Sequence, residues 1–128
     1  QLVLIARALV QDAYVLLLDE PTANLDRGNQ ILVLEHIKAL AREGYTVIQT
    51  THDPEHSFMF SDRILTMKDG TVLSVGAPAD ILNKETIDSL YGVDMEVSSL
   101  FDDKARFCVP SSVIYDKGRY HNTTISKN

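Results

Sequence analysis

Two adjacent acids, Asp19 and Glu20, follow directly on the uninterrupted apolar run Tyr14–Leu18. A run that is apolar on both faces is typical of a central strand in a parallel sheet, and open α/β sheets bind ligands at the carboxyl ends of such strands. Side chains alternate along a strand, so the two carboxylates point in different directions. One acid can therefore hold a cation while the other addresses a water molecule.

His52 follows a second β-rich run, Thr46–Thr50, and the residues between the two runs have the period of a helix. Strand, helix and strand in this order predict one right-handed parallel unit, so His52 ends the strand beside the one that carries the acids. A lone histidine is more often structural than functional. Its place beside the two acids nevertheless makes it a candidate for the same site.

The elements around this unit follow from periodicity and turn signals. Leu2, Ile5, Ala6 and Leu9 recur at helical spacing and predict a helix from Leu2 to about Val10. The helix between the two strands is expected from about Asn29 to Glu43, with Gly44 as its C-cap. Further expected elements are a short helix from Asp53 to about Phe60, an antiparallel hairpin of Arg63–Lys68 and Thr71–Val75 around Asp69-Gly70, helices Pro78–Leu82 and Lys84–Tyr91, short strands Glu96–Leu100 and Arg106–Val109, and a frayed tail His121–Asn128.

Composition limits the classes of function. The 128 residues are 45% hydrophobic, enough for one domain with a modest core. Their net charge is -6 and the 12 Lys and Arg residues are spread along the chain, so we expect no nucleic-acid partner. The run Tyr14–Leu18 is far shorter than the ~20 residues of a membrane-spanning helix, so any membrane contact is expected to be peripheral. The one cysteine, Cys108, is expected to be a small packed hydrophobe.

Four motifs resemble those of ABC ATPases, in the family's order and spacing. The run Val15–Thr22 resembles the Walker B motif, and Ala23–Asp26 resembles the D-loop. Thr51–Asp53 resembles the switch-histidine segment, with His52 placed 33 residues after Asp19. The start, Gln1–Leu9, is similar to the last residue of the LSGGQ signature and the helix that follows it. This resemblance implies an α/β architecture, a partial P-loop NTPase fold of parallel strands with helices plus a C-terminal antiparallel hairpin.

The resemblance also implies a role for each site residue. Asp19 would hold the Mg²⁺ bound to the β- and γ-phosphates of ATP, which suits a hard cation that prefers carboxylate and water oxygens. Glu20 would be the base that orients or deprotonates the attacking water, and His52 would reach the γ-phosphate. Asp26 would cross to the opposite subunit of an ATP-sandwich dimer, or cap the next helix, or both. Gln1, the last residue of the signature-like motif, would contact nucleotide.

A later pattern resembles the ATPase subunits of iron-siderophore, haem and cobalamin importers. It consists of Gly76–Pro78, Ile81-Leu82 and Leu90–Val93. The implied partners are a second ATPase subunit, transmembrane permease subunits and, indirectly, a periplasmic or extracellular binding protein. The implied location is peripheral, at the cytoplasmic face of the cell membrane. We expect residues 1–94 to belong to the ATPase domain and residues 95–128 to form an appendage and tail.

The phosphate-binding sequence G-x-x-x-x-G-K-[ST] does not occur in these 128 residues. We therefore expect the sequence to be the C-terminal part of a longer subunit, and to be inactive in ATP hydrolysis by itself. The strand edges and apolar faces left uncovered in such a part predict self-association.

Two other classes of function remain open. A soluble ABC-type ATPase acting on ribosomes or DNA would carry the same motifs without a transporter, but would favour a basic surface or a long coiled coil. A non-catalytic sensor or interaction module would depend on the residues after Met95.

Overall fold

The computed structural model describes residues 5–7, 10 and 13–115. Ile5–Arg7 and Val10 are helical, in agreement with the helix expected at the start of the chain. Gln1 and the tail His121–Asn128 lie outside the described residues. Three two-stranded sheets occur in the described part, one parallel and two antiparallel.

The first unit is the expected strand, helix and strand. Strand β1 (Val15–Leu18) pairs in parallel with β2 (Thr46–Gln49), and Leu18 stands opposite Gln49. Helix α2 (Arg27–Arg42) connects them. It begins two residues before the expected Asn29, because Asp26 provides the N-cap and the helix starts at the next residue.

Helix α2 covers one face of this sheet. Val33 and Ile37 form a buried cluster with Ile5, against which Leu18 of β1 and Val47 of β2 pack. The opposite face is apolar but open: Val15, Leu17 and Ile48 are 52%, 74% and 55% exposed. Within the described residues β1 pairs with β2 alone, so the expected central strand has one open edge here.

The middle of the molecule consists of helix α3 (Pro54–Phe60) and the hairpin of β3 (Ile64–Lys68) and β4 (Thr71–Gly76). The hairpin turns at Asp69 and Gly70, whose φ angles are 51° and 75°. The backbone of both residues is in the left-handed region, which a type I′ turn requires and which an Asp-Gly pair favours. The expected hairpin is confirmed.

Beyond the hairpin come two short helices and a second antiparallel pair. Helix α4 (Pro78–Ile81) precedes α5 (Lys84–Tyr91), which ends at Gly92 in the left-handed conformation. Strands β5 (Met95–Leu100) and β6 (Ala105–Pro110) agree with the two short strands expected after Met95. A final helix, α6 (Ser111–Tyr115), was not expected from the sequence.

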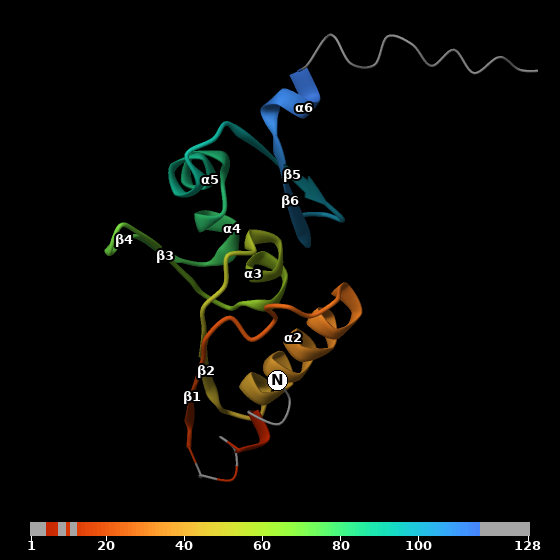
Figure 1. The fold of residues 1–128 in the computed structure, drawn as a ribbon, viewed down its shortest axis with the longest axis vertical. Coiled ribbons are helices and arrows are strands. Elements are labelled where there is room, and N and C mark those ends of the chain that lie inside the picture. Colours follow the sequence, from red (N-terminus) through yellow and green to blue (C-terminus); the bar gives the residue numbers. More distant parts are fainter. Residues whose placement is uncertain (1–4, 8–9, 11–12, 116–128) are drawn as a thin grey trace, which may run out of the picture.

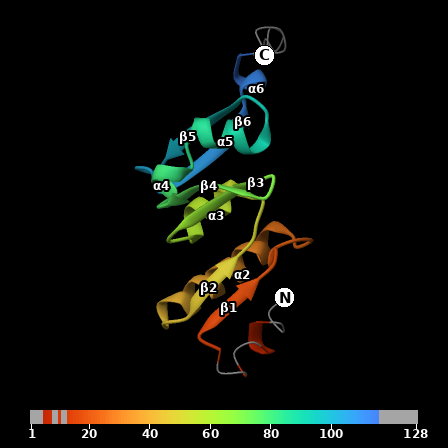
Figure 2. The ribbon, with the colours of Figure 1, turned by 90° about the vertical axis from the view of Figure 1, so that its left-hand side faces the viewer.

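The molecule is elongated, with the β1–β2–α2 unit at one end and α5, β5 and β6 towards the other (Figure 1, Figure 2). Helix α3 lies between the two ends, against β6 and α2. In the described part of the chain, no helix has both the length and the apolar character needed to span a bilayer.

Candidate active site

The candidate site lies at the carboxyl ends of β1 and β2. The parallel pairing continues one step past the assigned strands, since the Thr50 amide donates to the Leu18 carbonyl at 2.9 Å. Asp19 and Thr50 therefore leave the sheet side by side. The acids of the first strand and the segment that carries His52 meet at this edge.

The Thr50 side chain joins the two strand ends. Its hydroxyl donates to Asp19 Oδ1 at 2.5 Å and accepts the Glu20 backbone amide at 2.9 Å. One side chain thus fixes the Asp19 carboxylate and the main chain of Glu20. Sequence reasoning missed this role and assigned Thr50 only to a strand. The available signal was a hydroxyl residue at the end of the strand next to two acids.

Glu20 turns the chain sharply after β1. Its φ is 42°, in the left-handed region that L-residues enter at a cost, and its carbonyl accepts the Ala23 amide at 3.0 Å. Such backbone outliers persist where the surroundings determine them, and they gather at functional sites. Here the turn brings Glu20 Oε1 to 3.2 Å from Nδ1 of His52.

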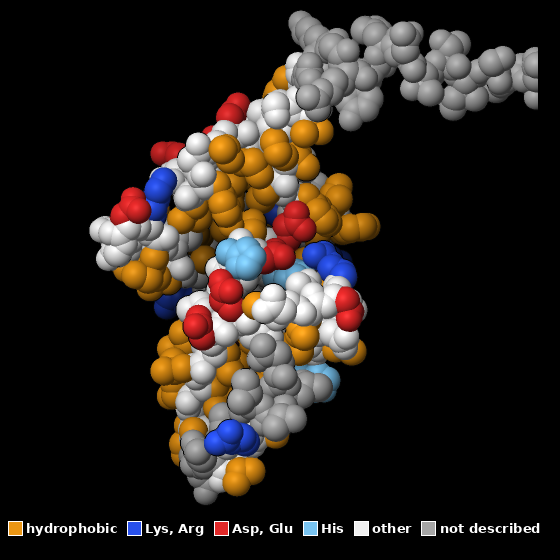
Figure 3. All heavy atoms as spheres, in the orientation of Figure 1, with side chains coloured by type: hydrophobic (Ala, Val, Ile, Leu, Met, Phe, Trp, Pro, Cys, Tyr) orange, Lys and Arg blue, Asp and Glu red, His pale blue; other side chains and the backbone are white. Residues whose placement is uncertain are grey.

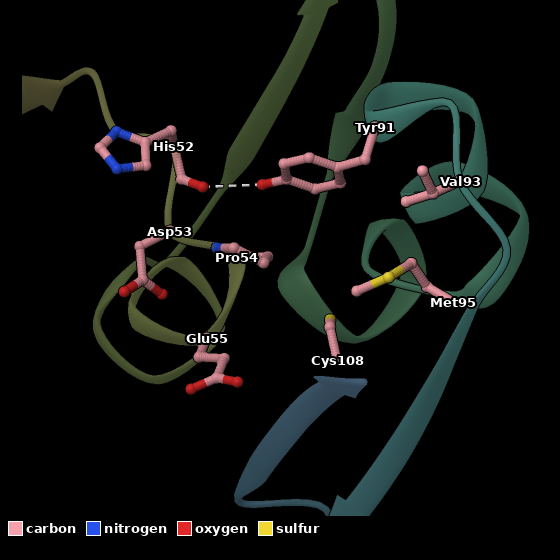
Figure 4. Close-up of a pocket in the computed structure, with 8 residues that line it drawn as sticks. All are labelled: His52, Asp53, Pro54, Glu55, Tyr91, Val93, Met95 and Cys108. Atoms are coloured by element: carbon pink, nitrogen blue, oxygen red, sulfur yellow. Dashed lines mark hydrogen bonds between the residues drawn. The ribbon is translucent and has the colours of Figure 1, made fainter. Parts of the chain in front are cut away.

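His52 is held by its main chain rather than by its ring. Its side chain is 80% exposed and that of Glu20 48% exposed, so both reach solvent as well as each other. The His52 carbonyl accepts the Tyr91 hydroxyl at 2.7 Å, as Figure 4 shows. The next residue, Asp53, caps α3 by accepting the His56 amide at 2.9 Å. The imidazole contacts Glu20 and is otherwise largely exposed at the strand ends.

Acidic side chains gather around a histidine near the middle of one face of the molecule (Figure 3). Asp19 is exposed, and its second carboxylate oxygen leaves acceptor capacity beyond the bond from Thr50. Mg²⁺ in proteins commonly takes one or two carboxylates, with water and substrate phosphates completing its shell. Asp19 fits that requirement, while no group of three or more His, Cys, Asp or Glu side chains suited to a metal occurs among the described residues.

Asp26 stands apart from this edge, at the start of α2. Its carboxylate accepts the Asn29 amide at 3.0 Å and the Asn29 side-chain amide at 2.6 Å. These bonds lower the pKa of Asp26, the amide of Asn29 contributing most. The expected N-cap is therefore present, and the loop before it contains the exposed Asn24 at a φ of 62°. Gln1, the remaining candidate, lies outside the described residues.

His36, His56 and Cys108 have structural environments, while His121 lies outside the described residues. His56 is 2% exposed, with Nδ1 at 3.2 Å from Asp53 Oδ2, and its ring meets Phe60 edge-on. His36 is exposed on α2 and contacts the Leu32 carbonyl through Nδ1. Cys108 is half-buried, and burial, with smaller contributions from Glu55 and Asp53, raises its pKa. It is a packed thiol, as expected.

A cavity of about 380 Å³ adjoins the His52 segment. It opens between the start of α3 and the elements near the other end of the molecule (Figure 4). Its lining residues are His52, Asp53, Pro54, Glu55, Tyr91, Val93, Met95 and Cys108. Burial in this region raises the pKa of Tyr91, which keeps its hydroxyl protonated and able to donate to the His52 carbonyl.

A substitution at Thr50 tests this arrangement. Thr50→Val keeps the shape of the side chain and removes the hydroxyl, so we expect the free energy of unfolding to fall by about 0.5 to 1.5 kcal/mol. In NMR spectra the resonances of Asp19, Glu20 and His52 should shift. Thr46→Val, on the same strand and exposed, is the matched control and should leave them in place. Unchanged resonances in Thr50→Val would mean that the hydroxyl does not organise the edge.

Comparisons with known proteins match the sequence and the fold. The chain is 39% identical over 95 residues to the hemin import ATP-binding protein HmuV of Rhodococcus jostii, covering 74% of this chain and 32% of that protein. It is 38% identical over 114 residues to the phosphonates import ATP-binding protein PhnC of Stutzerimonas stutzeri, covering 88% and 41%. No protein-family model matches the chain.

A solved structure agrees with the sequence matches. An ABC transporter assigned to the metal-chelate type, in an inward-facing conformation, superposes with a TM-score of 0.74 at 30% identity. The match covers 85% of this chain and 44% of that one. The chain spans about two fifths or less of the length of these curated relatives.

Proposed function

Because this chain belongs to the family of ABC transporter ATP-binding proteins, we propose that Asp19, Glu20 and His52 form the hydrolytic part of a Mg-ATP site that energises import. The observation that carries the proposal is the convergence of these groups on one sheet edge. Glu20 and His52 lie 3.2 Å apart there, and Thr50 binds both Asp19 and the Glu20 main chain.

Asp19 is the proposed metal-binding residue. When bound, Mg²⁺ would supply positive charge that offsets the negative charge of the phosphates and of the carboxylate that holds it. The Thr50 hydroxyl binds one oxygen of Asp19, which leaves the other oxygen for the cation. An edge with two exposed acids repels a triphosphate, so the cation is also needed for the substrate to approach.

Glu20 is the proposed general base. A carboxylate in this role must lie within hydrogen-bond reach of the attacking water, and it contributes about 10²- to 10⁴-fold. The side chain of Glu20 is half exposed, so a water molecule can reach it from solvent. The left-handed turn at this residue directs the carboxylate towards His52 rather than back along the strand axis.

His52 is proposed to contact the γ-phosphate. In the imidazolium form both ring nitrogens are donors, so His52 can donate through Nδ1 to the Glu20 carboxylate and through Nε2 to a phosphate oxygen. The contact with Glu20 also orients the ring. The pair therefore places a water-activating group and a phosphate-binding group on the same side of the edge.

Asp26 and Gln1 are proposed to act across subunits. In the segment before α2 the side chains of Asn24 and Asp26 are exposed, and Asp26 caps the helix, which suits a contact between this segment and a second ATPase subunit of an ATP-sandwich dimer. Gln1 is proposed to contact the nucleotide of the partner site. Both assignments are taken from the family motifs that these residues match.

The phosphates of ATP are proposed to be held by residues that this sequence does not contain. The 128 residues have no G-x-x-x-x-G-K-[ST] sequence, and the curated relatives are more than twice as long as the chain. We therefore expect the 128-residue chain alone to bind Mg-ATP weakly and to lack ATPase activity. The activity belongs to a subunit that joins this sequence to a phosphate-binding loop, here called the complete subunit.

The substitution Glu20→Gln tests the assignment in the complete subunit. The amide keeps the size of the side chain but cannot accept the proton, so ATP binding should be retained while turnover falls at least about 100-fold. Glu35→Gln, an exposed acid on α2, is the matched control and should leave turnover unchanged. Turnover near that of the wild type in Glu20→Gln would remove Glu20 from the mechanism.

For the substrate we propose import of a metal chelate, such as an iron-siderophore, haem or cobalamin. Support comes from the relative named for hemin import and from the solved metal-chelate type transporter. The relative named for phosphonates import has a different substrate, so the class needs a direct test. The subunit, reconstituted with its permease, should hydrolyse ATP faster with a loaded metal-chelate binding protein, and stimulation by a phosphonate-loaded one instead would contradict this choice.

The partners are proposed to be a second ATPase subunit and the transmembrane permease subunits. A periplasmic or extracellular binding protein would act indirectly, through the permease. These partners would place the subunit at the cytoplasmic face of the cell membrane, attached peripherally.

We also expect the 128-residue chain to self-associate. The open face of the β1–β2 sheet presents Val15, Leu17 and Ile48, and the β1 edge offers unpaired backbone groups within the described residues. Light scattering across a range of concentrations should give a dimer or larger species, the same with and without Mg-ATP. Leu17→Lys should shift this equilibrium towards monomer, while Leu32→Lys, at an exposed position of α2, should not. A monomer at high concentration would contradict the expectation.

A further inference from the structure

Tyr91, the last residue of α5, makes a hydrogen bond that no motif explains. Its hydroxyl donates to the His52 carbonyl at 2.7 Å across 39 residues of sequence. Figure 4 shows the phenol directed from α5 towards the His52 main chain, with the imidazole turned away from it. Resting on the function proposed above, we propose that Tyr91 is a positioning residue for His52, acting through this bond on the segment that carries the imidazole.

The segment around His52 needs such a support. Thr50 fixes one side of it to β1, and Asp53 fixes the other side by capping α3. Between them the His52 side chain is 80% exposed, and among the described residues its polar contact is with Glu20. An exposed side chain keeps its rotamer freedom, so its position depends on where the main chain places it. The bond from Tyr91 is a third attachment, made to His52 itself.

Tyr91 is 45% exposed, and the helix end that carries it is held by its neighbours. Helix α5 carries the fully buried Ile87 and ends in a left-handed cap at Gly92, whose amide donates to the Asp88 carbonyl at 2.8 Å. Asp88 Oδ1 accepts the Met95 amide at 2.7 Å, and Lys68 of β3 binds the Ser89 carbonyl. The end of α5 is thus connected to both hairpins.

A second attachment links β6 to α4 and α3. The guanidinium of Arg106, on β6, donates to the Ala79 and Leu82 carbonyls at 2.9 and 2.8 Å and lies 4.8 Å from the Phe58 ring centroid. Its bidentate bonds to Asp103 lower the pKa of that carboxyl to about 2. Residues after Met95 therefore hold α4 and α3 together. Met95 and Cys108, on β5 and β6, line the cavity together with Tyr91.

The bond at Tyr91 can be tested by turnover. In the complete subunit, Tyr91→Phe keeps the ring in the cavity and removes the donor, so kcat should fall about threefold to tenfold, the range of one hydrogen bond. The KM for ATP should change less than about twofold, because the bond does not touch the nucleotide. Tyr14→Phe, 82% exposed at the start of β1, is the matched control and should alter neither value. A KM that rises with an unchanged kcat would overturn the proposal.

A second measurement is independent of ATP hydrolysis. In the 128-residue chain, Tyr91→Phe should shift the NMR resonances of the His52 carbonyl carbon and imidazole, while those of α2 stay in place. If the resonance of the His52 carbonyl carbon shifts while those of the imidazole stay unchanged, Tyr91 only supports the fold. That result would overturn the proposal. Turnover near that of the wild type in Glu20→Gln would contradict the proposed function but would not affect this NMR result. The failure of the proposed function and the failure of the role of Tyr91 can therefore be distinguished.

Discussion

The parallel pairing of β1 with β2 is the constraint on which the rest of the site depends. It places Leu18 opposite Gln49 and carries the ladder on to Thr50, so that Asp19, Glu20 and the approach to His52 leave the sheet at one edge. Thr50 then orients these groups, because its hydroxyl binds both the Asp19 carboxylate and the backbone amide of Glu20. A register shift of one residue would point these groups to the opposite face. The packing of Leu18 and Val47 against α2 fixes that register.

The same edge shows how the fold divides its interactions between stability and chemistry. Helix α2 packs against one apolar face of β1 and β2 and so contributes to stability. The loop before α2 contains Glu20 and Asn24, whose backbones are left-handed. The C-terminal elements contribute from the other side, where Tyr91 reaches the His52 carbonyl. The functional side chains themselves stay exposed, as groups must be that meet a substrate and water.

Sequence reasoning located the elements that have strong local signals. The Asp69-Gly70 hairpin and the stop at Gly92 depend on a left-handed backbone that few residues adopt, and the N-cap at Asp26 depends on a side-chain acceptor that few residues carry; each is where the sequence predicted it. Helix α6 was missed because Ser111–Tyr115 is a single short turn without periodicity. Thr50 and Tyr91 were missed as site residues for a different reason. Their roles depend on contacts across 31 and 39 residues of sequence, which no local pattern records.

The claim that Asp19 holds the cation of the substrate is open to one direct measurement. In the complete subunit with a non-hydrolysable ATP analogue, Mn²⁺ in place of Mg²⁺ can be titrated by electron paramagnetic resonance, in the wild type and in Asp19→Asn. The account predicts that Asp19→Asn weakens Mn²⁺ binding at least about tenfold, with the affinity for the metal-free nucleotide unchanged. Equal Mn²⁺ affinity in the two proteins would contradict the assignment of this edge as the site of Mg-ATP chemistry.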